Sequence, residues 1–230
     1  ESMDAQGDTA VSAPSAPSTL VGDPRWRELY VAYTSGSSGF GAKGTVATVD
    51  AVFRYCAAKM RVEAIDSTAR VCLASNTTFD IYPSDAFAAA AARSCAVVSS
   101  RASMQADFAS VLRNGDVTHV CCTPTLFSLA QLPNGWDDVP SMRCVTLAGE
   151  RMSTETLERW GGPNESEETD KGRSTSTRGQ LFNAYGATEA TVLQTYAVMS
   201  IGDDPGRVGK AYGDWDFAAV HVVKRGVDGD

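Results

Sequence analysis

Residues 29–44 read Leu29-Tyr-Val-Ala-Tyr-Thr-Ser-Gly-Ser-Ser-Gly-Phe-Gly-Ala-Lys-Gly44, and this stretch decides the fold of the chain. Its apolar beginning, residues 29–33, predicts a strand, and residues 34–44 predict a loop rich in glycine and serine. Apolar residues then recur at helical spacing and predict a helix with one buried face: Val49, Val52, Phe53, Cys56 and Met60. The loop therefore lies between two predicted regular elements.

The composition of this loop is suited to holding phosphates. Glycines let successive backbone N–H groups converge on an anion, hydroxyl groups add donors, and a lysine adds positive charge. A flexible Gly/Ser linker has a similar composition, but a linker is not expected between a strand and an amphipathic helix. The loop is not a Walker A loop, because Ala42 separates Gly41 from Lys43. The predicted phosphate ligands are Thr34, Ser35, Gly36, Ser37, Ser38, Gly39 and Lys43.

Bulk properties limit the possible functions. The 230 residues suit one large domain or a piece of a larger protein, and 43% of them are hydrophobic. A formal charge of −8 argues against a nucleic-acid or anionic-membrane surface. Without a long apolar run or a leader pattern, we expect a soluble, cytoplasmic protein with no membrane contact. Six cysteines without a Cys-x-x-Cys pair, and only two histidines, predict buried free thiols and no zinc site.

The rest of the chain alternates strands with helices. Residues 1–24 are predicted to be a disordered lead-in, and 25–230 a partial domain with an exposed insertion at 163–179, which has no apolar residue between its ends. We expect Ser84 and Ser103 to cap helices and Thr123-Pro124 to begin one. Strands are expected at 70–74, 95–99, 117–122, 143–148, 180–184, 192–199 and 216–223. This order predicts an α/β fold with largely parallel sheets flanked by helices.

Four stretches lie where predicted strands end, the edge at which α/β sheets bind ligands. They are residues 34–44, Phe79-Asp80, Ala148-Gly149-Glu150 and Asn183-Ala-Tyr-Gly-Ala-Thr-Glu189. The first resembles the phosphate loop of the adenylate-forming (AMP-binding) enzymes, and the last resembles their Asn-x-Tyr-Gly-Pro-Thr-Glu motif. Val117–Thr125 and Leu147–Glu150 fall between them in the family's order. The resemblance is strongest to the adenylation domains of nonribosomal peptide synthetases, for the central part of their N-terminal subdomain.

The resemblance implies that a carboxylate attacks the α-phosphorus of ATP, with Mg²⁺ bound, to give an acyl adenylate and pyrophosphate. The carboxylate is already ionised at neutral pH, so no general base is needed. The implied catalytic residues are Lys43, Thr188 and Glu189, with Glu189 as the magnesium ligand. Alternatively, Glu189 could simply favour a helix start, and Tyr185 could be a core residue. The nucleotide contacts implied by the resemblance, beyond the phosphate loop, are Gly149, Glu150, Asn183, Tyr185, Gly186 and Thr188.

Asp80 is the residue that indicates the class of substrate. In amino-acid-activating members of the family, an aspartate after an aromatic residue pairs with the substrate's α-ammonium group; a turn or helix-capping role is the alternative. The lining implied by the resemblance is small, mostly apolar and uncharged, and predicts an uncharged α-amino acid of modest size. This lining consists of Ile81, Ser84, Cys121, Thr146, Ala148, Ala184, Val192 and Leu193.

Two departures from the family pattern leave alternatives open. The phosphate loop has one extra residue, and Ala187 replaces the proline of the last motif. We also expect the chain to be the middle of a larger protein, weakly active alone, because no counterpart of the family's C-terminal lysine is found. The acyl acceptor would be phosphopantetheine on a separate carrier-protein domain. The alternatives are a catalytically degenerate nucleotide-binding or interaction module, and an acyl- or aryl-acid ligase that takes another carboxylic acid.

Overall fold

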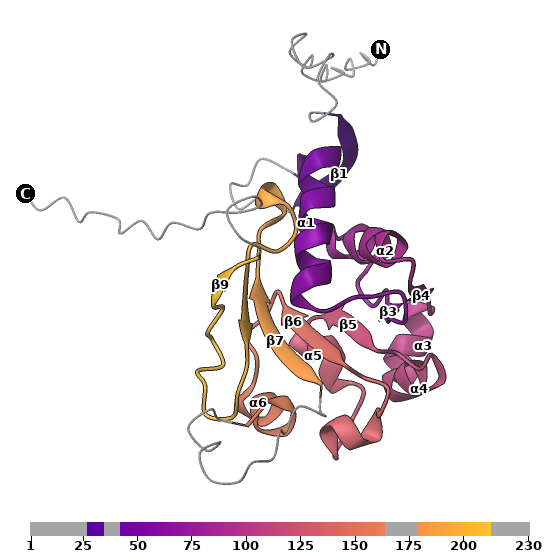
Figure 1. Cartoon of the computed structure of the whole chain (residues 1–230), viewed down its shortest axis with the longest axis vertical. Helices are drawn as coiled ribbons and strands as arrows, with labels where there is room; N and C mark the ends of the chain where they lie inside the picture. The colour runs from indigo at the N-terminus through magenta and orange to yellow at the C-terminus, as the bar shows by residue number, and fades with distance from the viewer. Residues whose placement is uncertain (1–26, 35–41, 164–178, 213–230) are drawn as a thin grey trace, which may run out of the picture.

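A seven-stranded sheet forms the centre of the molecule in the computed structural model, which describes residues 27–34, 42–163 and 179–212 (Figure 1). The strands lie in the order β4-β3-β5-β6-β7-β8-β9. They are β4 (Cys95–Val97), β3 (Arg70–Cys72), β5 (His119–Cys122), β6 (Cys144–Ala148), β7 (Gln180–Tyr185), β8 (Thr195–Val198) and β9 (Lys210–Ala211). Pairing is parallel from β4 to β7 and antiparallel for β8 and β9. The predicted α/β fold with a largely parallel sheet is confirmed.

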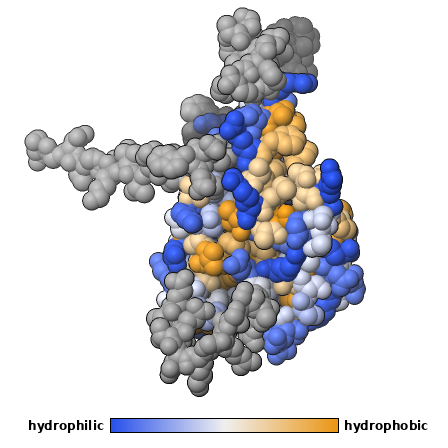
Figure 2. Space-filling model, in the orientation of Figure 1, coloured by the Kyte–Doolittle hydropathy of each residue, from blue (hydrophilic) through white to orange (hydrophobic). Residues whose placement is uncertain are grey.

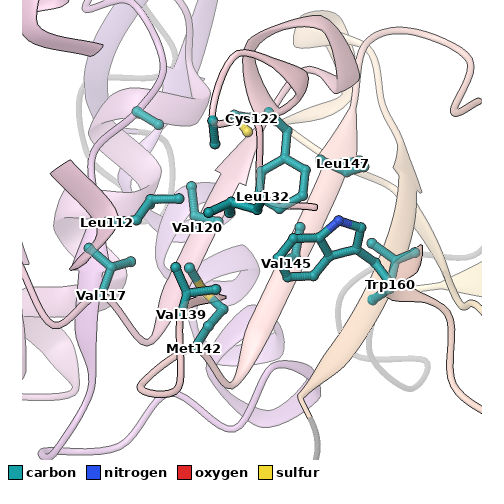
Figure 3. Packing of buried hydrophobic residues seen from close by; sticks show 14 of the residues in the cluster. Leu112, Val117, Val120, Cys122, Leu132, Val139, Met142, Val145, Leu147 and Trp160 are labelled. Atoms are coloured by element: carbon teal, nitrogen blue, oxygen red, sulfur yellow. The ribbon is translucent and has the colours of Figure 1, made fainter. Parts of the chain in front are cut away.

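Helices cover both faces of this sheet (Figure 1). They are α1 (Val49–Val62), α2 (Ile81–Ala91), α3 (Arg101–Ala106), α4 (Phe108–Asn114), α5 (Pro124–Ser128) and α6 (Thr154–Trp160), with 3-10 turns η3 (Gly135–Asp138) and η5 (Thr188–Ala190). Successive strand residues point to opposite faces, so Val145 and Leu147 pack in one cluster while Ala148 packs in another. Figure 3 shows the first cluster, where Val145 and Leu147 meet Trp160 of α6. The second cluster lies beneath α1 and α2.

A second, two-stranded sheet was not predicted from the sequence. Strand β1 (Glu28–Thr34) pairs antiparallel with β2 (Lys43–Thr48), and Thr34 faces Lys43 in the register. The phosphate-loop segment therefore connects two strands of a hairpin, not a strand and a helix as predicted. Residues 43–48 include the β-branched residues Thr45, Val46 and Thr48, which are compatible with a strand. Thr48 then caps α1 by accepting from the backbone N–H of Ala51 at 3.3 Å.

Two predicted helix caps are wrong. Ser84 lies inside α2, which begins at Ile81, and its hydroxyl donates to the Ile81 carbonyl at 2.8 Å. Ser103 lies inside α3, whose cap is Ser100, because the region forms two short helices instead of one. Asp107, with φ −157°, interrupts the helical conformation between α3 and α4, and its side chain caps α4. The predicted helix start at Thr123-Pro124 is confirmed. Ser153 caps α6 by accepting a hydrogen bond from the backbone N–H of Thr156.

The buried face of α1 also differs from the prediction. Val52 and Cys56 are buried, but the Phe53 side chain is 49% exposed and lines an apolar groove with Met60. Figure 2 shows this side of the molecule, where apolar surface runs over α1. The buried face instead includes Tyr55 and Lys59. None of the described helices is long and apolar enough to cross a membrane. The strand predicted at 216–223 lies outside the described residues, as do residues 1–24 and most of the 163–179 insertion.

Candidate nucleotide and substrate site

The hairpin and the η5 turn bring the first and last motifs together. Thr34 ends β1, and its hydroxyl donates to a carboxylate oxygen of Glu189 at 3.4 Å, across 155 residues of sequence. Lys43 begins β2 directly opposite Thr34 and is exposed. The other predicted phosphate ligands, Ser35 to Gly39, lie outside the described residues. A hydroxyl, a lysine and a carboxylate thus stand at one exposed edge, where a phosphate and its metal ion could be held.

The turn that carries Thr188 and Glu189 is held by a residue that sequence reasoning missed. The Gln194 side chain accepts from the backbone N–H of Ala187 at 2.6 Å and donates to the Ala190 carbonyl at 3.0 Å. Gly186 is required at the start of the turn, because a Cβ there would lie 2.1 Å from the Val192 carbonyl oxygen. Gln194 lies beyond the recognised motif, so the sequence carried no signal for it.

The predicted adenine contacts lie at the ends of β6 and β7. Tyr185 ends β7, and its side chain is 59% exposed. Asn183 is buried, and its amide group donates to the carbonyls of Pro205 and Arg207, so it anchors the segment before β9. Gly149 follows β6 with φ +85°, a conformation that favours glycine. The Glu150 carboxylate accepts a hydrogen bond from the Thr125 backbone N–H at 3.1 Å. The contact expected between Glu150 and adenine would therefore come from the Glu150 backbone.

Asp80 is buried next to the same turn. Its Oδ2 atom has no hydrogen-bond partner among the described residues. Burial raises the pKa of Asp80, and the nearby Thr188 side chain and backbone N–H groups, that of Val192 among them, oppose the rise. Val192 adopts φ 63°, a left-handed conformation that is strained for a β-branched residue. The backbone is therefore strained at Val192, the residue whose N–H group faces Asp80.

The predicted substrate lining comes together on one face of the sheet, beneath α2. Sheet register places Cys121 beside Thr146 and Ala148 beside Ala184. Ser84 is fully buried, and Ile81 is partly exposed at the start of α2. Val192 and Leu193 close the same apolar cluster. Residues from five separate segments therefore meet next to the Asp80 carboxylate.

Comparison with known proteins settles which family has this arrangement. The model of the AMP-binding enzyme family matches residues 3–225. The chain belongs to the AMP-binding enzyme family. It is 28% identical over 199 residues to the ferrichrome siderophore peptide synthetase of Mycosarcoma maydis, covering 84% of this chain and 5% of that protein. It is 32% identical over 167 residues to novobiocin biosynthesis protein H of Streptomyces niveus, covering 72% of this chain and 24% of that protein.

The solved structures agree on the fold. The Vibrio cholerae adenylation domain AlmE, solved in complex with glycyl-adenosine-5'-phosphate, superposes with a TM-score of 0.68 at 21% identity. That match covers 83% of this chain and 34% of the other. The chain of the nonribosomal peptide synthetase FmoA3, solved with AMPPNP, superposes with a TM-score of 0.64 at 19% identity, over 80% of this chain and 19% of the other. The present AMP-binding chain therefore spans a small part of the relatives it matches.

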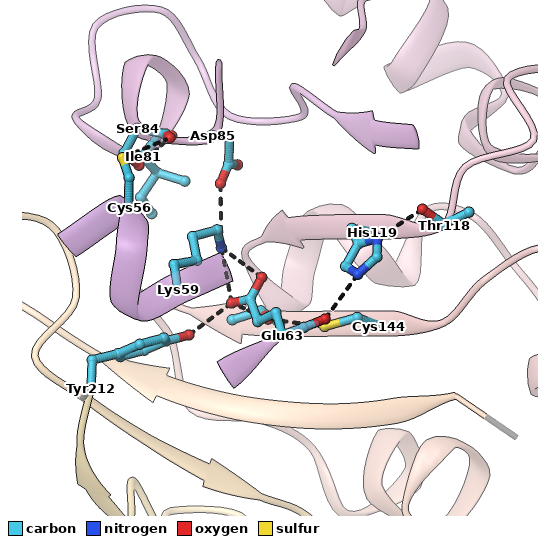
Figure 4. A network of polar contacts seen from close by, with 11 residues as sticks. Cys56, Lys59, Glu63, Ile81, Ser84, Asp85, Thr118, His119, Cys144 and Tyr212 are labelled. Atoms are coloured by element: carbon cyan, nitrogen blue, oxygen red, sulfur yellow. Dashed lines mark hydrogen bonds and ion pairs between the residues drawn. The ribbon is translucent and has the colours of Figure 1, made fainter. Parts of the chain in front are cut away.

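A buried ion cluster beside the predicted lining was missed by sequence reasoning (Figure 4). Lys59 of α1 and Glu63, which caps the C-terminal end of α1, form an ion pair at 2.8 Å, and Asp85 of α2 lies 3.3 Å from the Lys59 ammonium. One Glu63 oxygen also accepts hydrogen bonds from Tyr212 at 2.8 Å and from Thr146 at 3.0 Å. The predicted lining carries no charge itself, yet Thr146 connects it directly to this cluster. Lys59 and Glu63 stand four residues apart, a spacing that in sequence looks like an ordinary surface pair.

Burial changes the protonation of this cluster. It raises the pKa of Asp85 to about 6, although the positive charge of Lys59 opposes the rise. Burial acts to lower the pKa of Lys59, but the charges of Glu63 and Asp85 outweigh it, so the pKa is raised. In this AMP-binding chain, two carboxylates therefore compete for one ammonium group.

We expect the Asp85→Asn substitution to change how stability depends on pH. The pKa of Asp85 is higher in the folded state than in the unfolded state, so its contribution to stability is present below about pH 4 and is lost as pH rises through about 6. The unfolding free energy of the wild type, relative to Asp85→Asn, should fall by about 2–3 kcal/mol between those values. Urea unfolding of both proteins from pH 4 to 7.5 measures this. The exposed Asp137→Asn variant should follow the wild-type curve, and parallel curves for Asp85→Asn would contradict the prediction.

Proposed function

We propose that the chain is the nucleotide- and substrate-binding part of an enzyme that activates an uncharged α-amino acid as an acyl adenylate, using ATP, for transfer to a carrier thiol. The observation that carries this proposal is the position of Asp80. Its carboxylate is buried, has one oxygen without a partner, and lies close enough to the Thr188 side chain, next to Glu189 in the chain, for that group to act on its pKa. A buried acceptor with spare capacity, next to the candidate nucleotide site, suits an ammonium group on the acid that is activated.

The described side chains fit the chemistry that this reaction needs. A carboxylate oxygen of the substrate forms a bond to the α-phosphorus, and the bond from that phosphorus to pyrophosphate breaks. The substrate carboxylate is ionised at neutral pH, so the protein must align two anions and stabilise extra negative charge. In this proposal Thr188 would donate to the α-phosphate, and Lys43 would neutralise charge on the outer phosphates.

Glu189 fits a magnesium ion. Magnesium prefers oxygen ligands and is usually held by one or two carboxylates together with substrate phosphates and water. The Glu189 carboxylate is exposed and lies beside the Thr34 hydroxyl, at the edge where the phosphate loop begins. When bound, the ion would supply charge neutralisation to the phosphates. Tyr185 would then stack on adenine, with the Gly149 and Glu150 backbone along its edge. The acyl group would pass to phosphopantetheine on a carrier-protein domain.

The Asp80→Asn substitution tests the proposal. We expect about a thirtyfold rise in the KM for the amino acid, because a charge-assisted hydrogen bond to the α-ammonium group, worth about 2 kcal/mol, is weakened. The measurement is amino-acid-dependent exchange of pyrophosphate into ATP by the full-length protein. The KM for ATP should stay within about twofold, which separates this effect from general damage to the site.

Two other results would overturn the proposal in favour of the alternatives. Exchange driven by an acid without an amino group, unchanged in Asp80→Asn, would indicate an acyl- or aryl-acid ligase. ATP binding by a folded protein, without exchange for any amino or aryl acid, would indicate a degenerate nucleotide-binding module.

A further inference from the structure

Both hydroxyl groups of the predicted substrate lining already donate a hydrogen bond within the protein. The Ser84 hydroxyl donates to the Ile81 carbonyl at 2.8 Å, and the Thr146 hydroxyl donates to Glu63 at 3.0 Å. A hydroxyl has one proton but two acceptor lone pairs. Both groups can therefore offer only acceptor capacity to a ligand. Composition alone would allow each hydroxyl either to donate to a ligand or to accept from it. The structure leaves only acceptance, so the lining is more selective than its composition indicates.

Asp85 adds a stronger acceptor next to this lining. On a helix, residues i, i+1, i+4 and i+5 share one face, and in α2 these positions are Asp80, Ile81, Ser84 and Asp85. Asp85 thus lies one turn beyond Ile81, on the side of the helix that carries the predicted substrate contacts. Its side chain is 1% exposed, and neither carboxylate oxygen accepts a hydrogen bond from the described residues. Its one close charged neighbour there is Lys59, toward which it points in Figure 4.

Glu63 is the closer of the two ion-pair partners of the Lys59 ammonium. Both Glu63 oxygens lie within 2.9 Å of the Lys59 ammonium, and one of them also accepts from Thr146 and Tyr212. Asp85, by contrast, has a single ion-pair distance of 3.3 Å. A buried carboxylate without hydrogen bonds is costly, and such an unsatisfied group is commonly completed by a ligand or water. Asp85 therefore has more spare acceptor capacity than Glu63.

We propose that Asp85, with the Ser84 and Thr146 oxygens, forms an acceptor-only end of the substrate pocket that selects an amino acid whose neutral side chain donates a hydrogen bond, as a hydroxyl or amide does. The Lys59 ammonium disfavours a cationic side chain there, because the two positive charges would share Asp85. An aliphatic side chain leaves the carboxylate unsatisfied, and an anionic one meets a second negative charge. This inference rests on the proposed amino-acid activation and narrows its substrate class.

The test uses pyrophosphate exchange by the full-length protein with the twenty standard amino acids, 2-aminobutyrate and ornithine. We expect the best substrate to have a neutral donor side chain, and at least tenfold higher kcat/KM for threonine than for isosteric valine, or for asparagine than for aspartate. A best substrate with an aliphatic, anionic or cationic side chain would overturn the inference and leave amino-acid activation intact. No exchange with any amino acid would overturn both.

Two variants separate selectivity from stability. Asp85→Leu, which has a similar shape but no acceptor, should lower the donor-to-aliphatic ratio of kcat/KM at least tenfold while it leaves the KM for ATP unchanged. Asp85→Asn keeps an acceptor oxygen and should retain the preference. Thermal melting confirms that each variant is folded, and Asp137→Leu on the surface should leave the ratio unchanged. Equal ratios in the wild type and a folded Asp85→Leu would show that Asp85 serves the core alone.

Discussion

The Glu189→Ala substitution should lower kcat/KM for amino-acid-dependent pyrophosphate exchange by at least about a hundredfold, the range seen when a group that stabilises transition-state charge is removed. The Glu189 carboxylate is exposed, and in the described residues its hydrogen-bond partner is the Thr34 hydroxyl at 3.4 Å. Its removal should therefore cost little stability. The loss would fall on catalysis, because a bound magnesium ion would lose its protein carboxylate while the substrate carboxylate approaches the α-phosphate.

The matched measurement varies the magnesium concentration. Glu189→Asp keeps the carboxylate but shortens its reach, so it should need more magnesium for half-maximal exchange and recover part of the activity. Glu158→Ala, an exposed glutamate on α6, is the control and should stay within about twofold of the wild type. Exchange by Glu189→Ala within threefold of the wild type, at limiting magnesium, would refute the metal role.

The Lys59→Met substitution should destabilise the folded protein by about 3–5 kcal/mol, because it leaves buried carboxylates without their counter-charge. Lys59 is 1% exposed and lies within 3.3 Å of both Glu63 and Asp85. Methionine fills a similar volume, so the loss would report charge rather than a cavity. Urea unfolding at pH 7.5 measures the change, which should become smaller near pH 4.5, where Asp85 takes up a proton.

A surface pair of the same spacing provides the control. Arg159 and Glu155 of α6 also form an i,i+4 ion pair at 2.8 Å, but the glutamate side chain is 76% exposed. Arg159→Met should change stability by no more than about 1 kcal/mol. The triple variant Lys59→Met, Glu63→Gln, Asp85→Asn should recover most of what Lys59→Met loses, since no buried charge remains. A loss below about 1 kcal/mol in Lys59→Met would mean that the carboxylates are solvated or protonated at pH 7.5.

Local patterns predicted much of the fold. Short apolar runs located β3, β5, β6 and β7, and threonine followed by proline marked the start of α5. Cap signals failed where several hydroxyl residues stood close together, as at Ser100 and Ser103, because each can cap equally well in isolation. Strand β2 was missed because it is short and polar at its start, and its stability comes from pairing with β1.

The candidate site was likewise predicted only in part from the sequence. Motif order indicated the family and assigned roles to Thr188, Glu189 and Asp80, and these roles remain predictions. Gln194, which holds the η5 turn, has no local signature, because its function is a set of backbone contacts that exist only after the chain has folded.

By itself, the sequence determined the α/β class, the family and the residue types available to the site, since these follow from periodicity and from motifs read along the chain. The tertiary structure alone decided which groups meet. It brought Thr34 next to Glu189, and it buried Lys59, Glu63 and Asp85 beside Thr146. The physical reason is that helical spacing defines a face but not what covers it. The same i,i+4 pair is a weak solvated contact on α6 and a buried charge cluster on α1, where the sheet excludes water.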